Sequence, residues 1–369
     1  MPASPRETVW CAEPHTIAKI RLLSEYLKAW YSILGTRPVQ AGRPLLYVDG
    51  FAGPGEYTNH AVGSPVVAVQ AAISCRDHHA SGWRAGDINC AFIELDPARL
   101  AHLQHCIARL PPHPHVHPYF FAATFETQLV KVRQRLPLAF TDGSPLFVFI
   151  DPFGATGVPL PTVASILTTT CSEVLINFDA DGFARNLQND HVLDEVFGDR
   201  TWLPVRNEVS DFGVQCRRLL ALYKVKLKAL PTVKHVFSFE MRASAQVPSY
   251  HLVFATGHPL GLKKMKEAMR AIDQTGEYRF TDADVDQPRL LPWNDPTVFG
   301  AKMAAHFSGK AASYTELDNW ALDETDYTNP KEMLKFLESS DRIEVEAVPG
   351  AVRKKGTFPA EKIHRILFR

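Results

Sequence analysis

Hydrophobic positions along the first half of the chain form short continuous runs that alternate with stretches of helical periodicity. The runs predict buried strands at 45–49, 90–94, 116–121, 146–151 and 173–178. The periodic stretches predict helices at 15–34, 65–73, 97–110, 126–136 and 161–167, the second of them with Ser64 as its N-cap. Strands that are apolar on both faces and separated by helices indicate a parallel sheet covered on both sides.

This alternation ends after the fifth predicted strand. A long helix at 214–230 precedes two strands, at 233–241 and 249–255, that have only a turn between them. Two strands connected in this way pair antiparallel. Five parallel strands followed by an antiparallel hairpin make up the sheet of class I methyltransferases. The predicted fold class is therefore α/β, with a Rossmann-like sheet that ends in an antiparallel hairpin.

The C-terminal part of the chain has a different pattern. Residues 276–296 are rich in proline and aspartate and predict a linker. Helices are predicted at 298–306, 315–322 and 330–339, followed by two short strands at 343–348 and at 356–358 or slightly beyond, with a basic turn between them. Three helices and a basic hairpin predict a winged-helix domain at 297–369. The preceding domain, with its N-terminal helix, is predicted to span residues 1–275.

Composition and charge exclude some classes of protein. The 369 residues include 40 Lys and Arg and 40 Asp and Glu, so the net charge is +0. The whole chain is therefore not a polycation that coats nucleic acid, and such contact needs a local basic face. Six cysteines without a C-x-x-C pair indicate reduced thiols. With no signal-peptide pattern and no apolar run of ~20 residues, we expect a cytoplasmic protein without a membrane span.

A glycine-rich segment directly after the first strand is the first candidate site. Asp49 lies at the end of the strand, and Phe51, Gly53 and Gly55 follow it. An acidic residue before a glycine turn suits a cationic ligand that bears an amino acid, such as S-adenosylmethionine, lying against bare backbone. The segment is neither G-x-G-x-x-G nor a P-loop. The alternative is a glycine-rich turn with no ligand.

Two acidic residues follow the second strand. Glu94 at its end is placed to accept the ribose hydroxyls of a nucleoside cofactor. Asp96 is a second cofactor candidate, but its position before Pro97 equally suits a helix N-cap. The 45 residues between Asp49 and Glu94 exceed the usual spacing of about 20, so this interpretation assumes an insertion.

A polar tetrad follows the fourth strand, at the edge of the sheet where open α/β sheets bind ligands. Its residues are Asp151, Pro152, Phe153 and Gly154. A carboxylate accepts an N–H from a planar amine, and an aromatic ring stacks on a base. Asp151 and Phe153 are therefore the catalytic candidates. The alternative is a strand-ending turn.

Further substrate candidates come from polar and basic positions. Asn177 lies near the end of the fifth strand, and Arg185 follows it in a segment whose polarity is also explained by solvent. The three consecutive basic residues of the predicted wing are suited to phosphate, the alternative being an exposed loop that is basic for solubility. These basic residues are Arg353, Lys354 and Lys355. The alternating histidines at 113, 115 and 117 are interpreted as a surface loop, and no metal site is predicted.

At the level of families, the chain resembles the bacterial three-Cys-motif partner proteins. The matching residues are His15, Thr16, Lys19, Tyr26, Leu27 and Trp30 in the first helix, Tyr47 to Gly55, Gly63 to Pro65, and Phe149 to Gly154. The resemblance covers about the first 180 residues. It implies a methyltransferase-like protein with a partner that carries a radical-SAM-type three-cysteine motif.

The tetrad also resembles motifs of nucleobase methyltransferases. It is similar to the D-P-P-Y/F motif of adenine and cytosine amino methyltransferases, although Phe153 and Gly154 replace its last two residues. It is closer to the D-P-F-G of tRNA guanine-N2 dimethyltransferases. This similarity implies that Asp151 orients an exocyclic amine while Phe153 packs against the base or supports the loop.

These observations lead to two hypotheses about function. The first is an S-adenosylmethionine-dependent N-methyltransferase that acts on an exocyclic amine of a nucleobase in DNA or RNA. The second is a noncatalytic partner or adaptor of the three-Cys-motif protein that uses the winged helix for docking. Whether the chain is an enzyme stays open between them at this stage.

Overall fold

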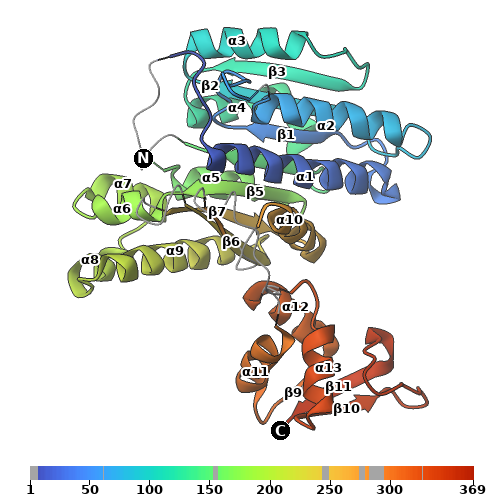
Figure 1. The fold of residues 1–369 in the computed structure, drawn as a ribbon. Helices are drawn as coiled ribbons and strands as arrows, with labels where there is room; N and C mark the ends of the chain where they lie inside the picture. The colour runs from blue at the N-terminus through green and yellow to red at the C-terminus, as the bar shows by residue number, and fades with distance from the viewer. Residues whose placement is uncertain are drawn as a thin grey trace. The chain divides into compact units, whose positions relative to one another are not determined.

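The computed structural model describes residues 7–60, 62–152, 157–242, 249–273, 279–281, 295–325 and 327–369. The chain divides into two compact units (Figure 1). The N-terminal unit comprises residues 1–274 and 278–288, and the C-terminal unit comprises residues 275–277 and 289–369. Each unit has its own hydrophobic core.

The N-terminal unit is built on one eight-stranded sheet in the order β3-β2-β1-β4-β5-β7-β6-β8. Strands β1 to β5 are parallel, and β7 lies antiparallel between β5 and β6. The predicted α/β fold class and its antiparallel hairpin are confirmed by this topology. The strands are β1 Leu45–Asp49, β2 Ile88–Glu94, β3 Val116–Ala122, β4 Leu146–Ile150, β5 Ser172–Phe178, β6 His235–Arg242, β7 Ser249–Thr256 and β8 Arg279–Thr281.

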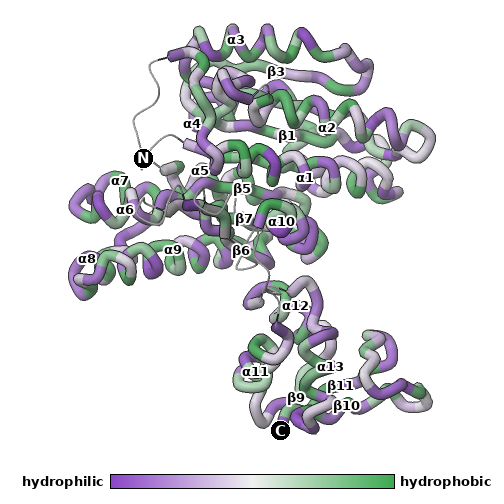
Figure 2. Tube along the Cα trace, viewed as in Figure 1, coloured by the Kyte–Doolittle hydropathy of each residue, from purple (hydrophilic) through white to green (hydrophobic). Residues whose placement is uncertain are grey.

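Helices cover both faces of this sheet, and every residue of β1, β2, β4 and β5 is buried. Helices α1, α2, α3 and α10 cover one face, whereas α4, α5 and α9 pack on the other (Figure 1). Figure 2 shows hydrophobic residues along the central strands and mixed colours along the covering helices. The helices are α1 Pro14–Thr36, α2 Ser64–His78, α3 Pro97–Ala108, α4 Phe125–Arg135, α5 Leu160–Ile166, α6 Ala180–Arg185, α7 Asp190–Phe197, α8 Leu203–Glu208, α9 Phe212–Lys228 and α10 Pro259–Ile272.

A buried hydrogen-bond network attaches α1 to the sheet. The hydroxyls of Tyr26 on α1 and Thr256 on β7 each donate to Glu173 on β5 at 2.6 Å. Burial raises the pKa of Glu173, and these hydrogen bonds partly oppose that effect. The network holds the N-terminal helix across the middle of the sheet.

Two local predictions in the N-terminal unit are wrong. Gly63, not Ser64, is the N-cap of α2, and Ser64 instead hydrogen-bonds to Asp49. Strand β8 lies within the predicted linker at 276–296 and pairs parallel with β6. After β5 the chain forms the short helices α6, α7 and α8, and the substrate candidate Arg185 is the last residue of α6.

The described residues of the C-terminal unit form three α-helices and a three-stranded sheet in the order β10-β11-β9. The second predicted wing strand is wrong, because residues 356–358 form a loop in which Phe358 is buried, and β11 begins at Ile363. The winged-helix assignment itself stays a prediction. The elements are α11 Pro296–Phe307, β9 Ala311–Ala312, α12 Tyr314–Glu324, α13 Lys331–Ser339, β10 Ile343–Ala347 and β11 Ile363–Phe368.

In the described part of the chain, none of the helices combines the length and the apolar character needed to cross a bilayer.

Candidate functional site

Four polar side chains lie where neighbouring strands of the sheet end. Glu94 ends β2, Asp49 ends β1, Asp151 follows β4, and Asn177 is the penultimate residue of β5. Because β2, β1, β4 and β5 are adjacent and parallel, these ends share one edge, which we call the carboxyl edge. Open α/β sheets bind ligands at this edge.

The glycine loop, residues 50–55, crosses this edge directly after β1. Gly53 has φ of +62° and Gly55 has φ of +87°, a conformation that favours glycine. A Cβ at Gly55 would lie 2.7 Å from Leu103 on α3, so the loop packs tightly against that helix. A Cβ at Gly53 would meet only the Trp10 ring, at 3.9 Å. Gly53 is buried, but it has more space beside its Cα than Gly50 or Gly55.

Asp49 is enclosed beneath the glycine loop and is 0% exposed. Its carboxylate accepts the Phe51 N–H at 3.3 Å and the Tyr47 hydroxyl at 3.2 Å, and it also hydrogen-bonds with Ser64. Burial raises the pKa of Asp49 to about 7, the hydrogen bonds oppose this, and the negative charge of Asp151 adds to it. The structure thus gives Asp49 the role of holding the loop from below.

Glu94 connects the glycine loop to the end of β2. Its carboxylate accepts the Gly53 N–H at 2.8 Å and the Asp96 N–H at 2.8 Å, and the residue is 6% exposed. Asp96 caps α3 by accepting the N–H groups of Ala98 and Arg99. The helix-cap alternative for Asp96 is therefore present in the structure, whereas Glu94 contacts Gly53, the least crowded glycine of the loop.

Asp151 is held by two donors from distant parts of the chain. Lys19 Nζ on α1 lies 2.5 Å from Asp151 Oδ2, and Asn177 Nδ2 donates to Asp151 Oδ1 at 2.7 Å. The Lys19 ammonium also lies 5.4 Å from the centre of the Tyr250 ring. The sequence prediction gave Lys19 no role in the site. One feature of the sequence could have indicated that Lys19 is buried: it lies among the apolar positions of the first helix, close to Leu22 and Leu23.

Tyr57 lies two residues after the glycine loop. Burial raises its pKa, and the negative charges of Asp151 and Asp49 raise it further. Its ring contacts Trp10 edge-on at 5.5 Å. Trp10 also stacks under the Arg99 guanidinium at 4.9 Å. The rings of Trp10 and Tyr57 therefore lie beside the glycine loop. The sequence did not predict this aromatic pair.

The remaining N-terminal candidates have different surroundings. Phe153 and Gly154 lie outside the described residues, and Pro152 is buried directly after Asp151. The Phe51 ring packs against Phe125 on α4 with a centroid distance of 5.7 Å, so it serves the core. Arg185 is exposed at the end of α6, with its guanidinium 5.8 Å from the Phe212 ring.

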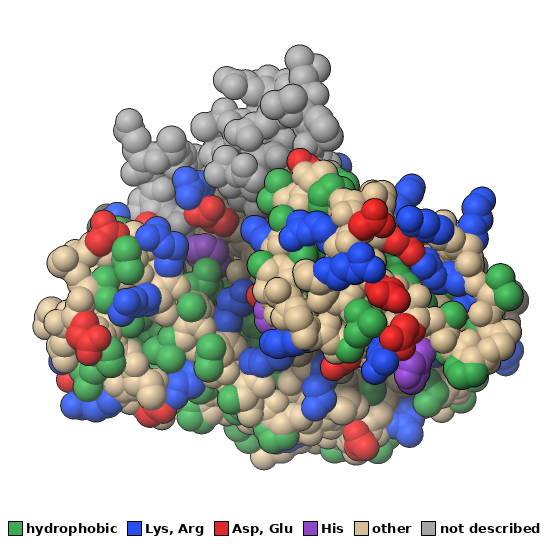
Figure 3. All heavy atoms as spheres, turned by 90° about the horizontal axis from the view of Figure 1, so that it is seen from below, with side chains coloured by type: hydrophobic (Ala, Val, Ile, Leu, Met, Phe, Trp, Pro, Cys, Tyr) green, Lys and Arg blue, Asp and Glu red, His purple; other side chains and the backbone are tan. Residues whose placement is uncertain are grey.

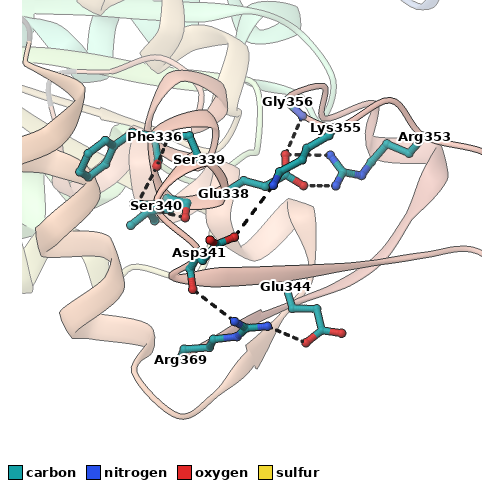
Figure 4. A network of polar contacts seen from close by, with 11 residues as sticks. Phe336, Glu338, Ser339, Ser340, Asp341, Glu344, Arg353, Lys355, Gly356 and Arg369 are labelled. Carbon is teal, nitrogen blue, oxygen red and sulfur yellow. Dashed lines mark hydrogen bonds and ion pairs between the residues drawn. The ribbon is translucent and has the colours of Figure 1, made fainter.

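The basic residues of the predicted wing belong to the C-terminal unit, where Arg353 is not an open phosphate ligand. It forms an ion pair with Glu338 on α13, both side chains are at most 10% exposed, and Gly356 N–H donates to the same carboxylate (Figure 4). The substrate role predicted for Arg353 stays a prediction, and this ion pair would have to open for Arg353 to meet a phosphate. Lys354 is exposed, and Lys355 lies 3.9 Å from Asp341.

Charge is interspersed on the surface in Figure 3. On the face it shows, blue and red side chains alternate among the described residues, with no broad area of one sign. This distribution agrees with the net charge of +0. A strongly basic face of the kind that binds nucleic acid by charge alone is not visible from this side.

Histidine and cysteine side chains also gather at two places. His115 and His117 pair with Asp87 at 2.9 and 3.0 Å. Among the described residues, one group has metal-ligand atoms within 4.8 Å of one another, namely Glu56, His102 and Cys106. Arg109 already contacts both Glu56 and Cys106, at 2.5 and 3.2 Å. The cluster is thus balanced by a cation of the chain itself.

Comparison with known proteins gives distant structural likenesses. No protein-family model matches the chain, and neither does any curated protein. Trm1 from Pyrococcus horikoshii in complex with S-adenosyl-L-methionine aligns with a TM-score of 0.36 and 10% identity over 99% of this chain and 94% of that one. The O-methyltransferase from Bacillus cereus with SAH aligns with a TM-score of 0.34 and 10% identity over 63% and 80% of the two chains. The fold class of the N-terminal unit rests on its own strand order.

Proposed function

We propose that the N-terminal unit is an S-adenosylmethionine-dependent methyltransferase whose acceptor is an exocyclic amine of a nucleobase in DNA or RNA. The observation that carries this proposal is the arrangement at the carboxyl edge. A carboxylate and an amide, Asp151 and Asn177, lie beside the strand that leads into the glycine loop. The strand order of the sheet and the similarity of the tetrad to nucleobase methyltransferases support the same reaction.

The residues around the glycine loop suit the proposed cofactor. We place the ligand against the uncrowded Cα of Gly53, and Glu94 still has acceptor lone pairs for ribose hydroxyls. Asp49 acts from beneath, by holding the loop and by contributing negative charge near a cationic ligand. When bound, S-adenosylmethionine supplies an electrophilic methyl group.

Asp151 has the chemistry that methyl transfer to an amine requires. Its carboxylate accepts one amine hydrogen, which aligns the nitrogen lone pair, and its charge stabilises the positive charge that develops on nitrogen. Lys19 and Asn177 fix the carboxylate in one orientation. Such an acceptor needs little acid–base help, because alignment and removal of water provide most of the effect.

Cofactor binding and methyl transfer test this proposal with the full chain. Calorimetry measures S-adenosylmethionine affinity, and incorporation of labelled methyl into total RNA and DNA, followed by nucleoside mass spectrometry, identifies the product. Asp151→Asn should leave cofactor affinity nearly unchanged and lower methyl transfer by about 10²-fold. Asp142→Asn, an exposed change at the other end of β4, is the matched control. A chain that does not bind S-adenosylmethionine contradicts the proposal.

One observation favours the noncatalytic alternative. The candidate catalytic carboxylate of Asp151 already pairs with the buried ammonium of Lys19. Under this alternative, the chain is the partner or adaptor of a three-Cys-motif protein. Its methyltransferase-like fold then serves docking and not methyl transfer. Cofactor binding without methyl transfer to any nucleic acid, together with copurification of a radical-SAM-type protein, supports this alternative.

A further inference from the structure

A group of metal-ligand side chains joins the end of the glycine loop to α3. His102 and Cys106 are four positions apart on α3, so both lie on the same face of that helix, and Glu56 directly follows the loop. A carboxylate oxygen of Glu56, a ring nitrogen of His102 and Cys106 Sγ lie within 4.8 Å of one another. Carboxylate, imidazole and thiolate are ligand types that bind Zn²⁺ in proteins. The sequence by itself did not predict this site, because Glu56 and α3 are far apart along the chain.

The surroundings of His102 leave one of its ring nitrogens facing a carboxylate. His102 Nδ1 lies 2.9 Å from the Pro54 carbonyl oxygen, which only accepts hydrogen bonds, so we assign a proton to Nδ1. In the neutral ring Nε2 is then an acceptor, and it faces Glu56 Oε1 at 3.4 Å. Two acceptors that face each other need a cation between them, either a second ring proton or a metal ion. A metal-bound histidine typically donates its other N–H to a carbonyl or carboxylate, as His102 does to Pro54.

The distances around His102 suit a tetrahedral metal. With bonds of about 2.0 Å to nitrogen and oxygen and about 2.3 Å to sulfur, tetrahedral ligand atoms lie about 3.3–3.6 Å apart. His102 Nε2 and Glu56 Oε1 are 3.4 Å apart. Cys106 Sγ completes the group on its buried side, 3.5 Å from His102 Nδ1, and needs a side-chain shift to reach a metal at Nε2. Three protein ligands leave one tetrahedral position for water.

Arg109 already supplies a cation to this group. Its Nη2 lies 2.5 Å from Glu56 Oε2 and 3.2 Å from Cys106 Sγ. The Arg109 side chain is 52% exposed, so it can turn into solvent at little cost. Burial raises the pKa of the Cys106 thiol, and the negative charge of Glu56 raises it further, while Arg109 opposes this effect. A metal ion would therefore have to replace both the guanidinium and the thiol proton.

We propose that Glu56, His102 and Cys106 bind Zn²⁺ and that the metal fastens the glycine loop to α3. On binding, Zn²⁺ forms bonds to one oxygen, one nitrogen and the sulfur, the Cys106 thiol proton passes to water, and Arg109 turns into solvent. The carboxylate and the thiolate then balance the two charges of the metal. Because the Pro54 carbonyl contacts His102 as well, the end of the loop is held through two neighbouring residues. The proposal does not depend on methyl transfer.

Co²⁺ and Zn²⁺ binding to the full chain under reducing conditions tests this site without an enzyme assay. After chelator treatment, the wild type should bind Co²⁺ with the visible bands of tetrahedral geometry and a thiolate-to-cobalt absorption in the near ultraviolet, and Zn²⁺ should displace it. Cys106→Ser should abolish the thiolate absorption, and His102→Gln should weaken Zn²⁺ binding by about 10²-fold. The matched controls, which should not change binding, are Cys11→Ser, an exposed thiol, and His105→Gln, an exposed histidine on the same helix.

Arg109→Gln distinguishes a metal site from a simple ion-pair cluster. Because this variant removes the competing cation, it should bind Zn²⁺ about 3-fold more tightly than the wild type. If Cys106→Ser does not fold, Glu56→Gln, a change at a partly exposed side chain, replaces it and should also weaken Zn²⁺ binding. Absence of Co²⁺ binding by the wild type, a thiolate absorption that persists in Cys106→Ser, or Zn²⁺ binding that is no tighter in Arg109→Gln overturns the proposal.

Hydrogen exchange tests the attachment of the loop. Zn²⁺ should slow exchange in peptides that cover residues 50–56 of the wild type, because the metal holds Glu56 against α3. The same peptides of Glu56→Gln should not respond to Zn²⁺. Equal exchange with and without Zn²⁺ in a wild type that binds the metal would overturn the proposed fastening of the loop.

Discussion

Glu94 at the end of β2 accepts a hydrogen bond from the backbone N–H of Gly53 at 2.8 Å. These residues are 41 positions apart in sequence, and the bond fixes the glycine loop after β1 relative to the neighbouring strand. The same carboxylate holds the turn into α3 through the Asp96 N–H. One side chain therefore sets the positions of both segments that border the proposed cofactor site.

Replacement of Glu94 by glutamine should weaken S-adenosylmethionine binding by about 10-fold or more. Glutamine keeps the shape but loses the negative charge, and its amide nitrogen cannot accept the Gly53 or Asp96 N–H. Calorimetric titration of the full chain measures the effect. Wild-type affinity in Glu94→Gln would exclude Glu94 from the cofactor site.

Asp96→Ala provides the matched comparison. Asp96 accepts two N–H groups at the start of α3, so its loss should lower the free energy of unfolding by about 1 kcal/mol. Cofactor affinity should change little, because this side chain serves the helix. Urea unfolding and calorimetry on the same preparation distinguish the two roles, and a large loss of affinity would return Asp96 to the cofactor site.

The buried carboxyl of Asp49 should make stability depend on pH. Its pKa rises from an ordinary 3.8 to about 7 on folding, so between these values the folded chain binds a proton that the unfolded chain releases. Stability from this group is therefore full below about pH 4 and is lost as the pH rises to about 7. Asp49→Asn should stabilise the chain relative to wild type more at pH 8 than at pH 5. A Tm difference independent of pH would contradict this expectation.

Gly55→Ala should disturb the glycine loop through packing as well as backbone strain. The new Cβ would lie 2.7 Å from Leu103 and 3.3 Å from Cys106, at φ of +87°. We expect a loss of about 2–4 kcal/mol in the free energy of unfolding and weaker cofactor binding. Gly42→Ala is the control, because φ there is +72° and nothing lies within 4 Å of the added Cβ. If both variants lose the same free energy of unfolding, backbone strain alone explains the loss and the contact with Leu103 adds nothing.

Arg353→Met should destabilise the C-terminal unit. It leaves Glu338 buried without its cation, at a cost of about 3 kcal/mol. Burial raises the pKa of Glu338, but the hydrogen bond from Arg353 and other contacts outweigh it and bring the pKa below its ordinary value. Hydrogen exchange of peptides from 331–369 should become faster in Arg353→Met and stay unchanged in Lys354→Met. Equal protection in both variants would show that the ion pair contributes little.

Replacement of Lys354 and Lys355 together tests the wing as a phosphate contact. If the C-terminal unit binds nucleic acid through this loop, the double variant should reduce the salt slope of binding by about 2. Affinity measured over a salt series checks this, and cofactor affinity should be unaffected. Equal salt slopes for the double variant and the wild type would show that the two lysines do not contact phosphate.

The hydrophobic pattern of the chain by itself determined the α/β class and the ends of its strands. Strands such as β4 are buried at every position and therefore appear as continuous apolar runs. The acidic residue that follows each run necessarily lies at the carboxyl edge, which is why Asp49, Glu94 and Asp151 could be identified in advance. The antiparallel pairing of β6 with β7 followed from the sequence pattern, which predicts no helix between the two strands.

Tertiary structure alone decided what those side chains contact. The Lys19 ammonium reaches Asp151 across 132 positions because Glu173 and Tyr26 hold α1 over the sheet. The Arg353 guanidinium turned out to be buried against α13, because Glu338 lies on a helix packed beside the hairpin. Local patterns report which face of an element is apolar, but the pairing of charges and the loss of solvent around them depend on segments that the fold brings together.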